Sequence, residues 1–318
     1  MSLISVIMPA YNAERTLGEA IASVLQQTHQ NWELIVVDDG SSDNSQQVVQ
    51  RFQDDRIRLL TGANEGVAIA RNRGIEQAQG DYVAFLDADD IWMPAKLAAQ
   101  LTALQAHPEA ALAYSWCDYI DNEGRWLCPG KRSLVEGIAY EQLLVANFLE
   151  NASTPLIRRS ALAAVGGFDP TLRCSQDRDL YLRLAAHYPF VTVPQVQVHY
   201  RMAEGAMSSR LREQEADRLK VIERGFAAAP AELQPLRRKS LAHLYRYLML
   251  RGVEEPPSPQ QSREVTRCLY LAVRYDPLLI IKQLRLLLTI CAKVGTGWLP
   301  RSVARWILSF SRRYQAIQ

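Results

Sequence analysis

Short apolar runs alternate with segments of helical periodicity over the first 114 residues of the chain. The runs predict strands at Ile4–Met8, Trp32–Val37, Ile57–Leu60, Tyr82–Leu86 and Ala111–Tyr114. The intervening segments predict helices: one with apolar positions Leu17, Ile21, Val24 and Leu25, one from Ser42 or Asp43 to Phe52, one over Gly66–Gln79, and one from Pro94 to about His107. Strands separated by helices predict an α/β fold, a mostly parallel sheet with helices on both faces.

The pattern changes twice further along the chain. Residues 115–202 are mixed, with a turn at Asn122–Gly124, a helix over Asp177–His187, and two strands at Phe190–Val193 and Val196–Arg201. From Leu211 onward only helical periodicity remains, interrupted by prolines. We therefore expect a first domain at residues 1–210 and an all-helical region at residues 211–318.

Charge is distributed unevenly over this framework. The 318 residues carry a formal charge of +2, which argues against a strongly basic nucleic-acid binder, so no nucleic-acid partner is expected. Residues 265–318 carry +8, which leaves −6 on the 264 residues before them. The five cysteines include no C-x-x-C pair, and the N-terminus lacks a signal-peptide pattern, so we expect a cytoplasmic protein. No uncharged apolar stretch reaches the length of a membrane-spanning helix.

Acidic residues follow two of the predicted strands. Asp38-Asp39 comes after the second strand, and Asp87-Ala88-Asp89-Asp90 after the fourth. Carboxyl ends of parallel strands meet at one edge of the sheet, where such folds bind ligands. Asp87 and Asp89 point to the same side of an extended backbone and suit Mg²⁺ or Mn²⁺, whereas a solvated turn is the alternative for one cluster alone. No G-x-G-x-x-G, Walker A or G-x-S-x-G sequence is present.

Several motifs, taken in order, resemble those of family 2 glycosyltransferases with the GT-A fold. The matching segments are Ser5–Asn12, Val37–Ser41, Asn64-Glu65-Gly66, Ala70-Arg71-Asn72, Phe85–Asp90, Gly166–Asp169 and Gln176–Leu180. The resemblance covers about residues 1–202 and not the helical region. It implies that residues 1–210 form a GT-A catalytic domain.

The resemblance also implies a role for each matching residue. Pro9, Ala10 and Tyr11 would line the nucleobase pocket, Asp39 would accept a hydrogen bond from a base N–H, and Arg71 and Asn64 would help to hold the nucleotide. Asp87 would reach the ribose or the metal, and Asp89 of the D-x-D motif would bind Mn²⁺ or Mg²⁺ between the donor's two phosphates. Asp177 would be the general base. The implied donor is a nucleotide-diphosphate sugar, with a UDP-sugar favoured.

This chemistry fits the residue types. A divalent cation stabilises the diphosphate leaving group, and a carboxylate activates the acceptor hydroxyl for an attack that inverts the anomeric carbon. The implied acceptor is a cell-surface glycan or a lipid-linked sugar, as in polysaccharide biosynthesis. A nucleotidyltransferase is less consistent with the chain, because a Gly-rich, Arg-containing loop after the first strand is absent.

The chain departs from the family pattern at two positions. Gln176 stands where the family usually has Glu, which keeps open the alternative of a catalytically impaired nucleotide-sugar-binding or scaffold protein. Tyr200-Arg201 is followed by Met202-Ala203 instead of a nearby His, so we interpret His199 as a strand residue. Arg201 is left with two interpretations, a group that neutralises the diphosphate or a surface residue of the strand. Trp92 and Trp116 flank the predicted site, but core packing is the better interpretation for each.

Basic and apolar residues are interleaved in the last part of the helical region. Leu278–Leu288 and Val303–Phe310 are accompanied by Trp298 and Trp306 and by basic residues, namely Lys282, Arg285, Arg301, Arg305, Arg312 and Arg313. This pattern is typical of helices that bind at a membrane surface. It favours peripheral association with the inner, cytoplasmic membrane face over a helical cap with solvated charges.

Overall fold

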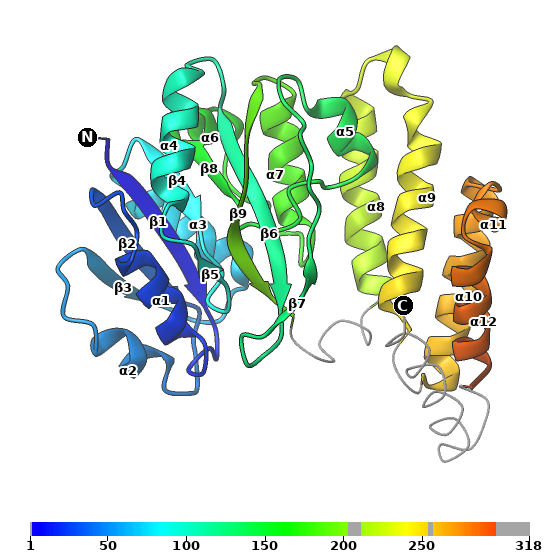
Figure 1. The fold of residues 1–318 in the computed structure, drawn as a ribbon, viewed down its shortest axis with the longest axis horizontal. Coiled ribbons are helices and arrows are strands. Elements are labelled where there is room, and N and C mark those ends of the chain that lie inside the picture. The colour runs from blue at the N-terminus through cyan, green and yellow to red at the C-terminus, as the bar shows by residue number, and fades with distance from the viewer. Residues whose placement is uncertain (1, 203–210, 254–256, 297–318) are drawn as a thin grey trace. The chain divides into compact units, whose positions relative to one another are not determined.

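The computed structural model describes residues 2–202, 211–253 and 257–296 (Figure 1). The chain divides into two compact units. The first comprises residues 1–143 and 147–203, and the second comprises residues 144–146 and 204–318.

One mixed sheet of nine strands runs through the described part of the first unit, in the order β3-β2-β1-β4-β8-β6-β9-β5, with β7 paired to β6 (Figure 1). The strands are β1 (Ile4–Ala10), β2 (Trp32–Asp38), β3 (Ile57–Thr61), β4 (Tyr82–Phe85), β5 (Ile91–Trp92), β6 (Leu112–Ile120), β7 (Trp126–Pro129), β8 (Pro155–Arg158) and β9 (Phe190–Arg201). All five strands predicted before residue 115 are confirmed, and β6 extends six residues beyond the predicted end at Tyr114.

The sheet is mixed, and parallel pairing occurs in two parts of it. β3, β2, β1 and β4 are parallel neighbours, as are β6 and β9. β8 is antiparallel to both β4 and β6, and β5 and β7 are antiparallel additions. Because β8 is antiparallel to both β4 and β6, β6 and β9 run in the same direction as β1. Among the described strands only β5, β7 and β8 run the opposite way, so the predicted mostly parallel sheet is confirmed with three antiparallel strands added.

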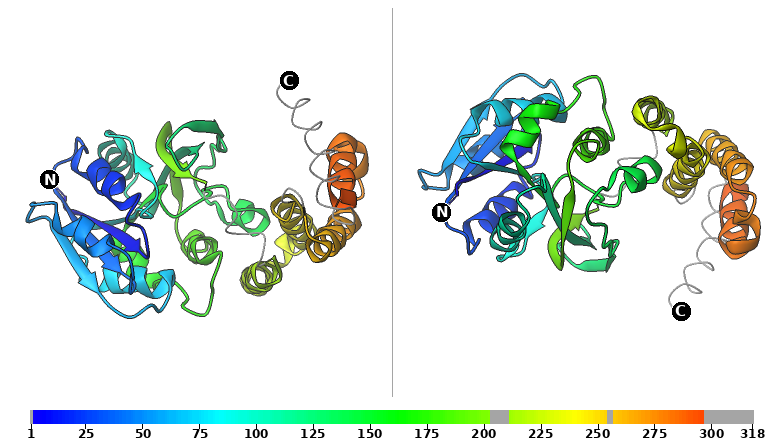
Figure 2. Two further views of the ribbon diagram at one scale, coloured as in Figure 1. Left: turned by 90° about the horizontal axis from the view of Figure 1, so that it is seen from below. Right: turned by 90° about the horizontal axis from the view of Figure 1, so that it is seen from above.

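Helices cover both faces of this sheet (Figure 2). They are α1 (Leu17–Leu25), α2 (Ser45–Gln50), α3 (Val67–Gln77), α4 (Lys96–Ala106), α6 (Arg159–Val165) and α7 (Gln176–Ala185). The short helix α5 (Tyr140–Val145) spans the boundary between the two units. Side chains alternate along β1, and this decides which helix each residue meets. Val6 and Met8 lie in one core cluster with Leu17 of α1 and Leu97 of α4. Ile7 faces Gly74 of α3, where an added Cβ would lie 2.3 Å from its side chain.

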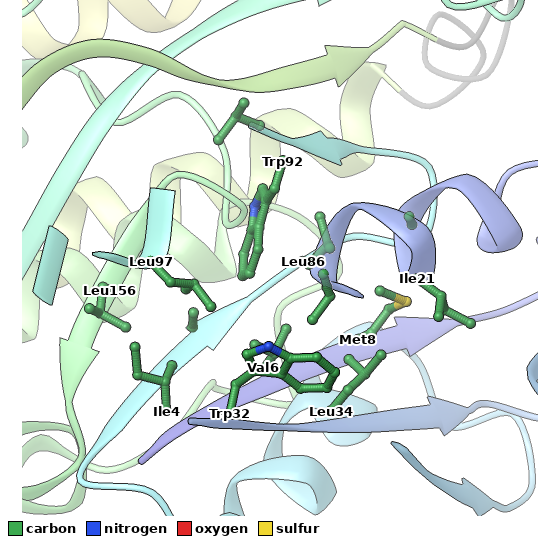
Figure 3. Close-up of a cluster of buried hydrophobic side chains, with 14 of the residues drawn as sticks. Ile4, Val6, Met8, Ile21, Trp32, Leu34, Leu86, Trp92, Leu97 and Leu156 are labelled. Atoms are coloured by element: carbon green, nitrogen blue, oxygen red, sulfur yellow. The ribbon is translucent and has the colours of Figure 1, made fainter. Parts of the chain in front are cut away.

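The core of the first unit is built from aliphatic and aromatic residues of the central strands and of the helices packed on them (Figure 3). Ile4, Leu34, Leu97 and Leu156 are fully buried, and Trp32 is 2% exposed. Each buried side chain of this size stabilises the fold by about 1.5–3 kcal/mol. This core holds the strands whose ends carry the acidic clusters.

Two predicted details of the middle region come out differently. The strands predicted at Phe190–Val193 and Val196–Arg201 form one strand, β9. Its register against β6 is interrupted, with Ser115 level with Val193 and Trp116 level with Val196. The intervening Pro194 lacks an N–H for the ladder, so the chain bulges there and pairing then resumes. The predicted turn at Asn122–Gly124 is confirmed between β6 and β7, with Gly124 at φ +78°.

The second unit is helical in its described residues. It contains α8 (Leu211–Ala228), a 3₁₀ turn η2 (Ala231–Leu233), α9 (Leu236–Arg251), α10 (Pro259–Tyr275), α11 (Leu279–Lys282) and α12 (Leu284–Thr296). Leu248, Val265 and Ala272 are fully buried in its core. α10 begins with a capping box at Ser258 and a proline in its first turn, so the proline marks a helix start. The predicted segment Val303–Phe310 and both Trp298 and Trp306 lie outside the described residues.

Within the described ranges, no helix combines the length and apolar character needed to cross a membrane.

Candidate active site

The carboxyl ends of β1, β2 and β4 lie side by side at one edge of the sheet. Ala10 of β1 is level with Asp38 of β2, and Ile7 of β1 is level with Phe85 of β4. The backbone N–H of Asp39 donates to the carbonyl of Ala10 at 2.8 Å. The two acidic clusters therefore share one rim, as the sequence predicts.

The end of β1 presents one aromatic side chain at this rim. Pro9 and Ala10 are buried within the strand, whereas the side chain of Tyr11 is 52% exposed. Asn12 has φ +50°, and its Oδ1 accepts a hydrogen bond from the Ser42 N–H at 2.8 Å. This contact fixes the loop after β1 against the loop after β2, beside the Tyr11 ring.

Asp39 holds the start of α3. Its two carboxylate oxygens accept the backbone N–H groups of Glu65 and Gly66 at 2.9 and 2.8 Å. Asn64 is exposed directly before this contact. Gly40 has φ +75°, and an added Cβ would lie 2.8 Å from the Asn64 nitrogen, so the turn requires glycine. The sequence did not indicate this structural role of the Asp39 carboxylate.

Arg71 of α3 is a buried cation at the centre of the rim. Its Nη2 donates to Asp87 Oδ1 at 2.5 Å, and its guanidinium lies 5.1 Å from the ring centre of Phe168. Burial lowers the pKa of Arg71, but the charge and hydrogen bond of Asp87 and the charge of Asp177 outweigh it, so the net pKa is raised. Arg71 thus interacts with both Asp87 and Asp177, which are 90 positions apart in the sequence.

Two matched motifs meet behind Arg71. The side chain of Asn72 donates to the Phe168 carbonyl and accepts from the Phe168 N–H, both at 2.8 Å. An added Cβ on Gly167 would lie 2.3 Å from Asn72 Oδ1, so the loop must approach closely here. The Phe168 ring also packs edge-on against Phe85 at 4.9 Å. This pairing ties the loop before α7 to the helix that carries Arg71.

The loop from Asp87 to Asp90 is held from two sides. Ser153 Oγ accepts from the Asp87 N–H at 3.1 Å and donates to the buried Asp90 carboxylate at 2.5 Å. Arg201 donates its backbone N–H to Asp90 at 3.0 Å and its Nε to the Asp89 carbonyl at 2.8 Å. Asp90 is therefore an anchor of the loop, while Asp87 and Asp89 remain partly exposed at the rim.

The carboxylates of Asp87 and Asp89 suit a divalent cation. Burial, and then the negative charge of Asp87, raise the pKa of Asp89 to about 6. A cation would relieve this unfavourable crowding of negative charge. Mg²⁺ commonly takes one or two carboxylates and completes its shell with substrate phosphates and water. The described residues contain no group of three or more His, Cys, Asp or Glu that could hold a metal by themselves.

Asp177 lies in the first turn of α7, where Ser175 has φ +60°. Its Oδ2 accepts a hydrogen bond from Asn147 Nδ2 at 2.9 Å. The neighbouring Gln176 is 6% exposed and donates to the Leu172 carbonyl at 3.0 Å. Gln176, which replaces the usual Glu of the family, is therefore buried, whereas Asp177 is only half-buried.

Three other residues considered from the sequence have structural contacts. Trp92 is 1% exposed and donates its indole N–H to the Ser153 carbonyl, and Trp116 donates its own to the Ser133 carbonyl. His199 pairs with Ile91 in the β5–β9 ladder, as predicted for a strand residue. Ser153 and Asn147 were missed, because a lone Ser or Asn in a loop carries no sequence signal without its partner.

A family model described as glycosyltransferase like family 2 matches residues 5–252. The chain belongs to this family. The GT-A fold is supported by a structure of Staphylococcus aureus TarS residues 1–349, which aligns with a TM-score of 0.63 at 18% identity over 100% of this chain and 92% of that one. A mannosyltransferase of Pyrobaculum calidifontis, solved with GDP-Man and Mn²⁺, aligns with a TM-score of 0.60 at 18% identity, over 94% of this family 2 chain and 86% of its own.

Curated relatives cover different shares of this family 2 chain. The Escherichia coli UDP-Glc:α-D-GlcNAc-diphosphoundecaprenol β-1,3-glucosyltransferase WfgD is 43% identical over 146 residues, which are 45% of this chain and 55% of WfgD. An uncharacterized Haemophilus influenzae glycosyltransferase is 41% identical over 50% of this chain and 66% of its own. The putative teichuronic acid biosynthesis glycosyltransferase TuaG of Bacillus subtilis is 33% identical over 65% of this chain and 82% of TuaG.

Proposed function

We propose that this family 2 chain is a metal-dependent, inverting transferase that moves a sugar from a nucleotide diphosphate to a hydroxyl group. The observation that carries the proposal is the assembly of Asp87, Asp89, Arg71 and Asp177 at one rim of the sheet. The negative charges of Asp87 and Asp177 both raise the pKa of Arg71, although the two residues come from separate parts of the sequence. A donor diphosphate, a cation and an acceptor hydroxyl require this combination of charges in one place.

The nucleotide would occupy the ends of β1 and β2. Tyr11 offers an exposed ring for stacking on the base, beside the buried Pro9 and Ala10. Asp39 already accepts two backbone N–H groups, and each carboxylate oxygen has a second lone pair for a base N–H. Asn64 lies at the same turn. A UDP-sugar is the favoured donor, because WfgD is named for UDP-Glc and TarS was solved with UDP-GlcNAc.

Asp87 and Asp89 would hold Mn²⁺ or Mg²⁺, which would act as a Lewis acid on the donor diphosphate. The P. calidifontis mannosyltransferase, solved with Mn²⁺, supports this choice of cofactor. Arg71 keeps Asp87 in place through its 2.5 Å contact and adds positive charge beside the phosphates. Ser153 and Arg201 keep the loop fixed, so no rearrangement is needed as the leaving group develops charge.

Asp177 would act as the general base. The acceptor oxygen forms a bond to the anomeric carbon while the bond from that carbon to the diphosphate oxygen breaks. The acceptor proton passes to the Asp177 carboxylate, and attack from the side opposite the leaving group inverts the anomeric centre. The first turn of a helix favours the ionised carboxylate that this step requires.

The acceptor would be a cell-surface glycan or a lipid-linked sugar at the cytoplasmic membrane face. WfgD is named for a diphosphoundecaprenol-linked acceptor, and TuaG for teichuronic acid biosynthesis. In the second unit, Ile281, Leu284 and Leu288 are 78%, 52% and 59% exposed, and Lys282 and Arg285 lie among them in the sequence. Exposed apolar residues beside basic ones suit the surface of an anionic membrane.

The donor site is tested by thermal unfolding with UDP, GDP, dTDP and CDP, each with and without Mn²⁺. A ligand at 100 times its Kd adds about 2.7 kcal/mol of stability. We expect one diphosphate to stabilise the protein with Mn²⁺, and Asp89→Ala to abolish the effect. Asp55→Ala, at an exposed aspartate of the same unit, is the matched control. No stabilisation by any nucleotide would refute the proposal.

Catalysis and membrane association need separate tests. Asp177→Asn should lower sugar transfer to a small residual rate while Mn²⁺-dependent nucleotide binding persists. A binding or scaffold protein would show no transfer even in the wild type. The triple variant Ile281→Ser, Leu284→Ser and Leu288→Ser should lose sedimentation with phosphatidylglycerol vesicles. Equal sedimentation of the triple variant and the wild type would contradict membrane association through this surface.

A further inference from the structure

An amide group contacts the proposed base directly. Asn147 Nδ2 donates to Asp177 Oδ2 at 2.9 Å, and Asn147 Oδ1 accepts the Leu149 N–H at 3.0 Å. The second bond fixes the orientation of the amide, because its oxygen must face the Leu149 N–H and its nitrogen then faces Asp177. The donor is therefore presented to the carboxylate by the local turn.

The backbone of Asn147 is itself held in place. Lys131 Nζ donates to the Asn147 carbonyl at 2.8 Å, and the Lys131 N–H donates to Glu150 Oε2 at 2.8 Å. Glu150 adopts φ +71°, a left-handed conformation that costs a non-glycine residue energy and persists when its surroundings impose it. Its other oxygen accepts from the Tyr119 hydroxyl at 2.9 Å. These contacts fix the turn that carries Asn147.

This segment does not need the Asn147 amide in order to dock on α7. Arg178 donates twice to the Leu143 carbonyl at 3.1 and 3.0 Å, and the Tyr181 hydroxyl donates to the Asn151 carbonyl at 3.1 Å. Both contacts come from α7, on either side of Asn147 in the partner segment. The hydrogen bond from the Asn147 amide to Asp177 is thus additional to contacts that already hold the segment against α7.

We infer that Asn147 is a positioning residue that sets the rotation of the Asp177 carboxylate toward the acceptor hydroxyl; this inference rests on the proposed function. The terminal torsion of an aspartate is broad and nearly two-fold, so one fixed donor selects one orientation of its oxygens. A hydrogen bond to the charged form also favours the ionised carboxylate. Asp177 also interacts electrostatically with Arg71 and Tyr181.

The decisive variant is Asn147→Asp in the full-length chain. It keeps the size of the side chain and an oxygen for the Leu149 N–H, but it replaces the donating NH₂ group with a second oxygen that faces Asp177. We expect kcat to fall about 100-fold with the KM for the donor unchanged, because misorientation of a reacting group by about 1 Å has that effect. Asn147→Ala should lower kcat in the same way, and Lys131→Met should lower it less.

A double-mutant cycle separates positioning from a structural role. In an Asp177→Asn background, Asn147→Ala should change the residual rate by less than 2-fold, on the order of the additivity limit for independent effects. Asn44→Ala is the matched control, because Asn44 Nδ2 donates to the exposed Glu14 carboxylate at 2.8 Å in the same unit. Asn44→Ala should keep the wild-type kcat.

The outcomes distinguish failure of the proposed function from failure of the positioning role of Asn147. If wild-type protein transfers no sugar, the proposed function fails. If the wild type is active and Asn147→Asp retains wild-type kcat, or its loss persists in the Asp177→Asn background, the positioning role is overturned. A variant with raised donor KM and lowered unfolding temperature, but unchanged kcat, would likewise show that Asn147 serves only the fold.

Discussion

Arg201 provides the sharpest test of how the acidic loop is built. Its side chain is 4% exposed, and its guanidinium donates to the carbonyls of Asp89, Asp121 and Asn122 at 2.8, 3.1 and 2.8 Å. The fourth partner, Glu19, is 60% exposed. The sequence left Arg201 open as a diphosphate ligand or a surface residue, but these contacts assign its donors to the fold.

The cost of Arg201→Met follows from these partners. The methionine fills most of the space of the arginine stem but leaves three carbonyl oxygens without a charged donor. Loss of such a buried, charge-assisted set costs about 3–5 kcal/mol. The ion pair with Glu19 adds little, because that carboxylate regains water when the partner is lost. Arg201→Lys keeps the charge with one donor centre, and its cost should be intermediate.

Urea denaturation followed by tryptophan fluorescence measures this cost. Four of the six tryptophans lie in the first unit, including the buried Trp32 and Trp92, so the emission reports mainly on that unit. Arg51→Met, at an exposed arginine, is the control. Mn²⁺-dependent stabilisation by nucleotide should also weaken in Arg201→Met, because the Asp89 backbone loses its fixed position. An unfolding free energy within about 0.5 kcal/mol of the control would refute the reasoning.

Three further changes have defined outcomes. Burial raises the pKa of Glu33, but hydrogen bonds from Ser5, Gln79 and Arg58 outweigh it and lower the pKa overall. Glu33→Gln should therefore cost about 1–2 kcal/mol of unfolding free energy at pH 7. Urea titrations at several pH values should show this difference disappear as the pH falls through the lowered pKa. Gly167→Ala places a Cβ 2.3 Å from Asn72 Oδ1 and should abolish transfer while far-ultraviolet circular dichroism is retained. Asp39→Asn should weaken nucleotide binding at least 10-fold in calorimetry, since one of its two backbone N–H contacts then meets an NH₂ group.

Local patterns were sufficient to predict most of the fold. The apolar runs of β1, β2 and β4 and the helical spacing of α1 and α3 depend on neighbours in sequence, so their positions were predicted correctly. The direction of β8 was not predictable in this way. Pro155–Arg158 is a four-residue strand whose two neighbours, β4 and β6, come from earlier in the chain, and nothing in its own residues states which way it enters the sheet.

The candidate site was predictable to the extent that its residues sit in motifs at strand ends. Asp39, Asp87 and Asp89 could be placed at one rim because parallel strands align their carboxyl ends. The supporting contacts could not be predicted. Ser153 reaches Asp90 across 63 positions and Asn72 reaches Phe168 across 96, and such pairs depend on how β8 and the loop before α7 pack.

The proposed function predicts that cation and nucleotide bind together at the rim. Burial, and then the negative charge of Asp87, raise the pKa of Asp89, and Arg71 is already paired with Asp87. A diphosphate alone would add negative charge to this site, whereas a cation alone would lack the phosphate oxygens that complete its shell. Each ligand should therefore raise the affinity for the other, and thermodynamic linkage requires the two factors to be equal. Calorimetric titration of UDP at several Mn²⁺ concentrations, and of Mn²⁺ at several UDP concentrations, would measure both factors. Equal UDP affinity with and without Mn²⁺ would mean that Arg71 and the backbone bind the diphosphate by themselves.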